Sequence, residues 1–221
     1  MTTSQASRTL ETATLFGIAV ETAREIKAAP RAGGQRPALI SVVFSVIALE
    51  SFMNEMTDYA QDMTDYQPFV EGPEALVFAQ VMGDAEEAHA RLESKFTLAK
   101  WILSGRNIDR GGQPYQDFAL LMRLRNGLVH TKPNKLFIHG VTTNGEAHGT
   151  MLARFGDKNI LADDLNSGSW TYLAQTKTVA EWSCRTAGHV VNDLCSAVPQ
   201  NNFKTVLDFV NASFQSHIAT L

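Results

Sequence analysis

The chain has 221 residues, of which 44% are hydrophobic and 19% are charged, and its formal net charge is −4. This composition excludes a wholly disordered or collagen-like chain, and the length fits a single domain, which we expect to span residues 1–221. Two cysteines exclude a disulfide scaffold, and the negative net charge excludes a generic binder of polyanions.

The compartment is predicted from three features. The first ten residues are polar, with Arg8 and no apolar core, so we expect no secretory signal. The longest apolar run, from Ala38 to Leu49, is shorter than the roughly 18–20 residues that cross a bilayer. Cys184 and Cys195 are expected on one helix, about 16 Å apart and beyond disulfide reach. We therefore predict a cytoplasmic protein that does not enter a membrane.

Helical periodicity dominates the first 130 residues. Apolar spacing predicts an amphipathic helix from Leu10 to Ala28. A second helix is expected from Pro37 to Asp62, and its first half is apolar all round, which is typical of a central helix. The following stretch is predicted as a loop at 63–73, a short helix at 74–82, a helix at 86–104 ended by Gly105, a polar turn at 106–112 and a helix at 115–130.

The pattern changes after Pro133. Two apolar runs flank Asn144-Gly145, a dipeptide typical of hairpin turns, so an inserted β-hairpin is predicted at about 135–155. Helices are expected again at 178–198 and 203–218. The predicted fold class is mainly all-α, a helical bundle with a long central helix pair and one inserted β-hairpin.

Charge is distributed unevenly along the chain. Residues 50–90 carry ten acidic groups and no Lys or Arg, whereas residues 91–135 carry nine basic groups and three acidic ones. The basic segment is a candidate surface for a phosphate-bearing ligand. The alternative is that it faces the acidic segment, within one chain or across a dimer.

Common chemical motifs are missing from the sequence. It contains no GxGxxG, no GxxxxGK[ST] and no GxSxG, and its six histidines form no HExxH or Cys/His cluster. We therefore predict neither a metal nor a cofactor.

One polar run closes an otherwise apolar helix: Arg125-Asn126-Gly-Leu-Val-His130, followed by Lys132-Pro133. Asn126 and His130 are four residues apart and share a helix face, whereas Arg125 lies about 140° from His130. Arg125 must reach round the helix or meet its target from another chain. The alternative is structural, because a cationic histidine in the last turn is favoured by the helix dipole.

The run Arg-Asn-x-x-Val-His before Lys-Pro resembles the Rx4–6H signature of the HEPN superfamily. Two further stretches are similar to bacterial HEPN-like proteins: Ala-Leu-Glu-Ser-Phe-Met-Asn-Glu at 48–55 and the Leu-x2-Lys-Phe run from Leu92. The resemblance covers about residues 38–133 and a helix from Ala180. It implies an all-α bundle and, as in many members, a ribonuclease of antiviral defence or a toxin–antitoxin system.

The chemistry implied by this resemblance is metal-independent RNA cleavage, in which the ribose 2′-OH attacks the adjacent phosphorus. His130 suits proton transfer because an imidazole titrates near pH 6.5. Arg125 suits the phosphate because its guanidinium stays charged and donates several hydrogen bonds. Asn126 would orient either group or contact the phosphate.

Supporting residues and partners complete the hypothesis. Glu50 and Glu55 on the preceding long helix are candidates for orienting Arg125 or His130, although a plain salt bridge is the simpler role. Arg123, Lys132 and Lys135 are candidates for RNA or phosphate binding.

We expect RNA as the substrate and a homodimer whose twofold axis sets one motif against the other. An antitoxin or defence-system protein is a further expected partner. The alternatives are a non-catalytic nucleotide-binding or protein-interaction module, and a structural dimer in which His130 only ends a helix.

Overall fold

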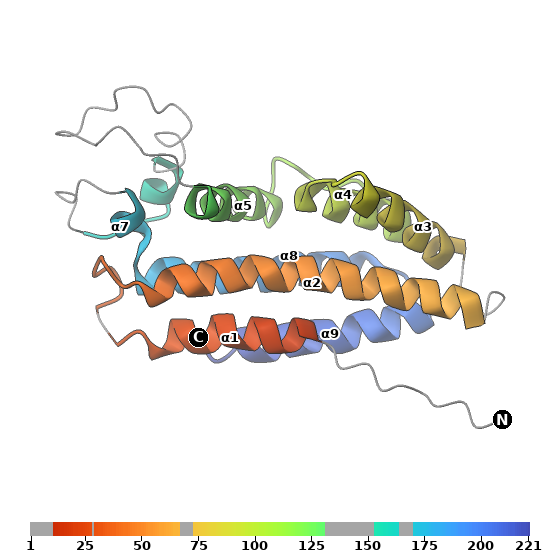
Figure 1. Cartoon of the computed structure of the whole chain (residues 1–221), viewed down its shortest axis with the longest axis horizontal. Coiled ribbons are helices and arrows are strands. Elements are labelled where there is room, and N and C mark those ends of the chain that lie inside the picture. The colour runs from red at the N-terminus through yellow and green to blue at the C-terminus, as the bar shows by residue number, and fades with distance from the viewer. Residues whose placement is uncertain (1–10, 28, 67–72, 131–152, 164–169) are drawn as a thin grey trace.

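The computed structural model describes residues 11–27, 29–66, 73–130, 153–163 and 170–221, and all the regular secondary structure in these ranges is helical (Figure 1). The predicted all-α fold is thereby confirmed for the described chain. A short helix lies at 153–157. The other helices are α1 (Glu11–Glu25), α2 (Pro37–Tyr66), α3 (Pro73–Glu87), α4 (Leu92–Ser104), α5 (Tyr115–Val129), α7 (Trp170–Ala174), α8 (Lys177–Ala197) and α9 (Asn202–Ile218).

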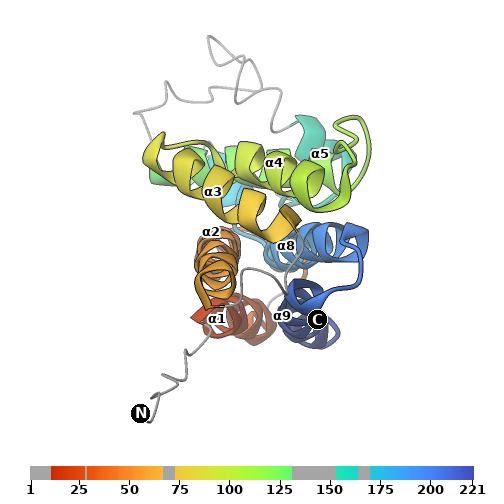
Figure 2. The ribbon, with the colours of Figure 1, turned by 90° about the vertical axis from the view of Figure 1, so that its right-hand side faces the viewer.

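The helices form two layers. Seen end-on in Figure 2, α1, α2, α8 and α9 occupy the corners of a four-helix bundle, and α2 and α8 are its long central pair. Helices α3, α4 and α5 form a second layer that packs on α2 and α8. The apolar first half of α2 is explained by this arrangement, because α2 contacts helices of both layers.

A group of buried aromatic rings joins the two layers. Phe52 of α2 lies 6.0 Å from Phe96 of α4 and 6.4 Å from Phe214 of α9, measured between ring centroids. Phe118 of α5 lies 5.2 Å from Phe96. All four rings are at most 1% exposed. These contacts fix α4 and α5 relative to α2, and the candidate site lies between those helices.

The helix predicted at 86–104 is confirmed from Leu92 to Ser104 and at its end by Gly105, but its predicted start is wrong, because α3 ends at Glu87 and α4 begins at Leu92. His89 takes a left-handed conformation with φ 52°. Its N–H donates to the carbonyl of Glu86, and the next N–H, of Ala90, donates to that of Ala85. This hydrogen-bond pattern commonly ends a helix, and the left-handed residue in it is usually a glycine. Because a histidine takes that place here, the sequence gave no signal for the end of α3.

Other boundaries also differ from the prediction. Helix α2 continues to Tyr66 into the expected loop, α3 is longer than the expected 74–82, and α7 was not predicted. Most of the predicted β-hairpin lies outside the described residues. Its last part, 153–155, is helical instead of extended, so that part of the hairpin prediction is wrong.

One helical segment within the described ranges, Pro37–Asp62 of α2, is long and apolar enough to span a membrane, and 50% of its most apolar window is buried inside the protein. The central helix of a bundle meets the same criterion, because it is apolar on all sides. The cytoplasmic location stays a prediction.

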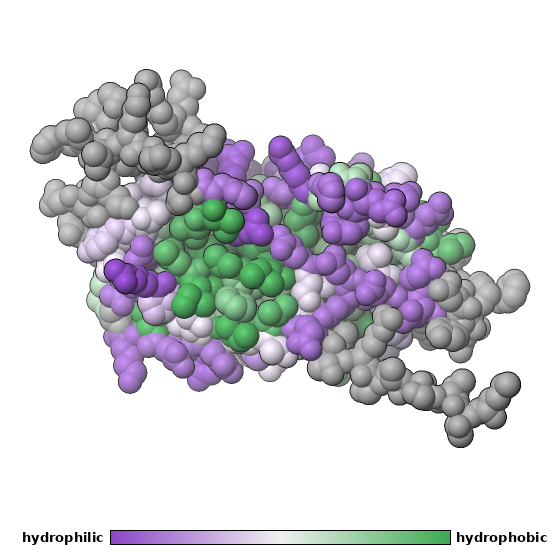
Figure 3. Space-filling model, viewed as in Figure 1, coloured by the Kyte–Doolittle hydropathy of each residue, from purple (hydrophilic) through white to green (hydrophobic). Residues whose placement is uncertain are grey.

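An apolar patch is visible on the face of the molecule in Figure 3, over α1, the first half of α2 and the end of α5. The large apolar side chains that these three helices expose are Ile18, Ile40 and Val129. Contiguous exposed apolar surface of this kind is typical of an interaction site. Val129 directly precedes His130 in the sequence.

Candidate functional site

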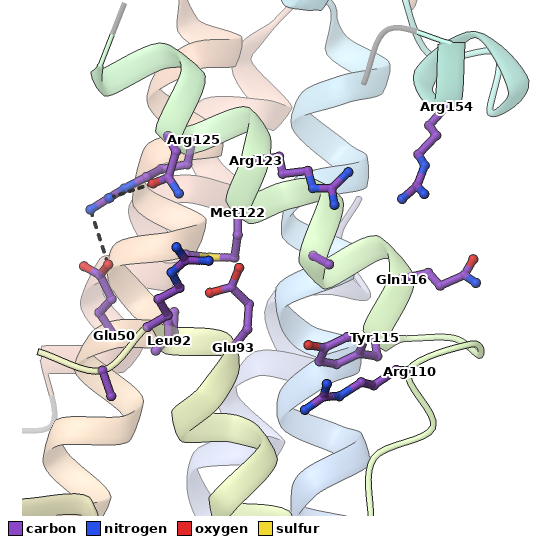
Figure 4. A pocket seen from close by; sticks show the side chains of 14 residues that line it. Glu50, Leu92, Glu93, Arg110, Tyr115, Gln116, Met122, Arg123, Arg125 and Arg154 are labelled. Carbon is purple, nitrogen blue, oxygen red and sulfur yellow. Dashed lines mark hydrogen bonds and ion pairs between the residues drawn. The ribbon is translucent and has the colours of Figure 1, made fainter. Parts of the chain in front are cut away.

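Arg125 connects α5 to α2. Its Nη2 donates to Oε1 of Glu50 at 3.3 Å and its Nη1 donates to Oδ1 of Asn126 at 3.2 Å (Figure 4). The Arg125 side chain is 23% exposed and that of Glu50 is 40% exposed. A guanidinium has five N–H donors, so three remain, and the buried Nε has no partner in the described structure. Arg125 is therefore oriented by two neighbours and keeps donors for a further acceptor.

A groove of about 740 Å³ opens beside this pair, between the start of α4 and the outer face of α5 (Figure 4). Among its lining side chains five are arginines and only two, Glu50 and Glu93, are carboxylates. We call it the arginine groove. Its arginines are Arg91, Arg110, Arg123, Arg125 and Arg154.

Most of the positive charge in the arginine groove is not neutralised. Within the part of the chain that the structure describes, only Arg125 forms an ion pair, and the other four guanidinium groups have no side-chain partner. These four side chains are also exposed to solvent. Arg91 is the N-cap of α4, so the positive end of that helix dipole faces the same region. The groove therefore favours a ligand with several negative charges.

Where the structure describes them, the basic segment, residues 91–135, contacts the acidic segment, residues 50–90, through few ion pairs. Among the described residues, two ion pairs join these segments, Arg125 with Glu50 and Lys95 with Glu86. They account for two cations and leave Arg91, Arg110 and Arg123 without a carboxylate. Mutual neutralisation within one chain is therefore an incomplete explanation of the basic segment.

His130 lies outside the arginine groove. It is the C-cap of α5, its backbone N–H donates to the carbonyl of Asn126 at 2.9 Å, and its side chain is exposed. The structure thus brings Arg125, Asn126 and Arg123 to the groove but does not bring His130 into it. Lys132 and Lys135 lie outside the described residues.

The two predicted carboxylates have different surroundings. Glu50 contacts Arg125, as the salt-bridge alternative predicts. Glu55 lies five residues further along α2, about 140° round the helix, and its Oε1 accepts from the N–H of Thr12 at 2.9 Å and from the Ser51 hydroxyl at 3.2 Å. It therefore caps the start of α1, and the structure does not bring it to Arg125.

A smaller hollow of about 300 Å³ adjoins the groove and shares Glu50 with it. His89 and Lys95 also line it. Lys95 pairs with Glu86, and burial lowers the pKa of Lys95 while the charge of Glu50 raises it. No cluster of three potential metal ligands occurs among the described side chains.

Sequence reasoning missed three of the groove arginines. Arg91 and Arg110 belong to the connections before α4 and α5, and Arg154 comes from the short helix at 153–157. The excess of basic residues between 91 and 135 was a signal for the first two. Arg154 gave none, because its place in the groove depends on the fold.

Comparisons with protein-family models, with curated proteins and with solved structures found no match to this chain. The HEPN resemblance therefore rests on the run from Arg125 to His130 and its neighbouring stretches. A functional proposal has to be argued from the site itself.

Proposed function

We propose that this chain is a metal-independent endoribonuclease of HEPN type, acting in antiviral defence or a toxin–antitoxin system. The observation that carries the proposal is the arginine groove, in which Arg125 and Asn126 lie beside four guanidinium groups that have no ion-pair partner among the residues that the structure describes. RNA offers a row of phosphates that such groups bind well, because the guanidinium fork matches two phosphate oxygens.

The proposed reaction is an intramolecular transesterification. The 2′-oxygen forms a bond to phosphorus as its proton passes to a base, and the bond to the 5′-oxygen breaks as that oxygen takes a proton from an acid. The products are a 2′,3′-cyclic phosphate and a 5′-hydroxyl. Arg125 would stabilise the negative charge that develops on the phosphate oxygens, and His130 would transfer the protons.

The proposal requires a second copy of the chain, because His130 lies outside the groove of its own chain. A twofold dimer through the apolar patch would bury Ile40 and Val129 and set His130 at the interface. Replacing Ile40 by Glu should then convert the dimer to monomer, as measured by light scattering, and abolish cleavage. A monomeric wild-type chain that cleaves RNA would refute the composite site.

The central test is incubation of the purified chain with unmodified RNA in EDTA, followed by analysis of the product ends. We expect cyclic phosphate ends from the wild type. Arg125→Ala and His130→Ala should each lower the rate by about 10²-fold or more. Arg185→Ala and His189→Ala are matched controls, since both side chains are exposed on α8 and line neither hollow. Circular dichroism checks that each variant is folded.

A second candidate is a non-catalytic RNA-binding module. The specific observation in its favour is that Glu50 already holds Arg125 while His130 is absent from the groove. In that case RNA binds, no product ends form, and His130→Ala changes nothing.

A further inference from the structure

We propose that the end of the groove remote from the Glu50–Arg125 pair is a subsite for the single-stranded RNA that flanks the cleavage point. This inference rests on the proposed function and assigns its substrate a path along α5. We call this end the strand subsite, and it consists of Arg110, Tyr115, Arg123 and Arg154.

The charge of the strand subsite is suited to a row of phosphates. Its three arginines are exposed and have no carboxylate partner among the described residues, in contrast to Arg125. In Figure 4, Arg123 and Arg154 extend toward the same side of α5, and Arg110 lies next to Tyr115 nearer the start of that helix. Binding phosphate there would not require any existing ion pair to break.

An aromatic ring lies among these cations. Tyr115 is half-buried, and its ring packs edge-on against Phe118 with centroids 6.3 Å apart. Pockets for single strands combine positive charge along the backbone with aromatic rings on which bases stack. Tyr115 supplies such a ring next to Arg110, so the subsite offers contacts to both the phosphates and a base.

The length of the groove limits the strand to a few nucleotides. From Tyr115 to Arg125 the helix advances about 15 Å, which corresponds to roughly four stacked nucleotides at about 3.4 Å each. A double-stranded RNA reader uses a much longer surface, of about 16 base pairs, and its bases are not available for stacking. The groove therefore fits a single strand.

The test measures binding separately from cleavage. A fluorescein-labelled 12-nucleotide RNA with 2′-O-methyl riboses cannot undergo 2′-OH attack, so its fluorescence anisotropy with the full-length chain reports binding alone. The competitors are an unlabelled duplex of the same sequence and AMP. The variants are Arg110→Ala/Arg154→Ala, Tyr115→Leu and the matched control Arg185→Ala, whose exposed side chain lies outside the groove.

We expect the double arginine variant to bind RNA about tenfold or more weakly, because each substitution removes charge-assisted hydrogen bonds to phosphate. Tyr115→Leu should weaken it about fivefold or more through lost stacking. Arg185→Ala should bind as the wild type does. The duplex should compete at least about tenfold less well than the single strand.

Three results would overturn the subsite. The double arginine variant could bind RNA with unchanged affinity, the duplex could compete as well as the unlabelled single strand does, or AMP could compete at the same concentration as the unlabelled single strand. The last result would assign a mononucleotide site instead. Failure of the proposed function looks different, since it leaves binding by the strand subsite intact while unmodified RNA stays uncleaved. Cleavage that persists in the double arginine variant at unchanged KM would count against the subsite and not against the nuclease.

Discussion

The dependence of RNA affinity on salt is the sharpest quantitative prediction from the arginine groove. Each phosphate that a protein neutralises releases a condensed counterion, and for single strands log K falls with log salt by about 0.7 per contact. Titrating the 2′-O-methyl strand at 50 and 200 mM KCl therefore counts the arginines that act on RNA.

The structure supplies the expected count. Four groove arginines have no ion-pair partner among the described residues, while Arg125 is held by Glu50. Four contacts give a slope of about −2.8, so a fourfold rise in salt should weaken binding about 50-fold. If RNA displaces Glu50 and Arg125 makes a fifth phosphate contact, the slope steepens to about −3.5 and the affinity falls about 130-fold over the same rise in salt.

The variants separate charge from stacking. Arg110→Ala or Arg154→Ala should each make the slope shallower by about 0.7, because one counterion fewer is released. Tyr115→Leu should lower affinity at every salt concentration and leave the slope unchanged, since stacking releases no counterion. A wild-type slope near zero, or slopes that do not change in the arginine variants, would refute the reasoning.

Three further predictions concern the ion pair, the core and the thiols. Glu50→Gln should tighten RNA binding about two- to fivefold at low salt, because it frees Arg125. It should lower the free energy of unfolding by less than about 1 kcal/mol, because both side chains of the ion pair are partly exposed. A large loss of stability in urea would indicate a structural role for the pair instead. Phe96→Ala should lower the free energy of unfolding by about 3–5 kcal/mol, measured by urea denaturation, because the ring is 1% exposed and contacts both Phe52 and Phe118. Both cysteine thiols should resist a disulfide reagent at pH 8 until the chain unfolds, since burial raises the pKa of Cys184 and raises that of Cys195 to about 12; rapid labelling of the native chain would contradict this.

The bundle helices were predictable because their apolar residues recur at helical spacing, on one face of α1, α8 and α9 and all round the first half of α2. Helix α8 was expected at 178–198 and spans Lys177–Ala197. The hydroxyl of Thr176 caps its start by accepting the N–H of Val179 at 3.0 Å. The break between α3 and α4 was not predictable from apolar spacing, because His89 adopts a conformation that usually signals itself by a glycine.

The candidate site was predictable where it is local in sequence. Arg125 and Asn126 were found as polar residues at the end of an apolar helix, and Glu50 was found on the helix expected to neighbour it. Arg91 reaches the groove because α4 packs on α2 beside α5. Arg154 reaches it from the short helix at 153–157. In that segment Phe155 packs on Trp182 of α8, and the adjoining Lys158 pairs with Asp117 of α5. Sequence spacing carries no information about such contacts across the fold.

Net charge is a poor guide to the charge of the arginine groove, because part of the acidic segment lies far from it. The chain is acidic overall, and residues 50–90 carry ten of its carboxylates. Along α2, however, Asp58 and Asp62 lie about 12 and 18 Å beyond Glu50, farther than the Debye length of about 8 Å at physiological salt. The groove itself is lined by five guanidinium groups and by the carboxylates of Glu50 and Glu93, and Glu86 in the adjoining hollow is paired with Lys95. A negative net charge argues against a generic binder of polyanions, but it leaves room for a local phosphate site, because screening makes the local balance of charge decisive.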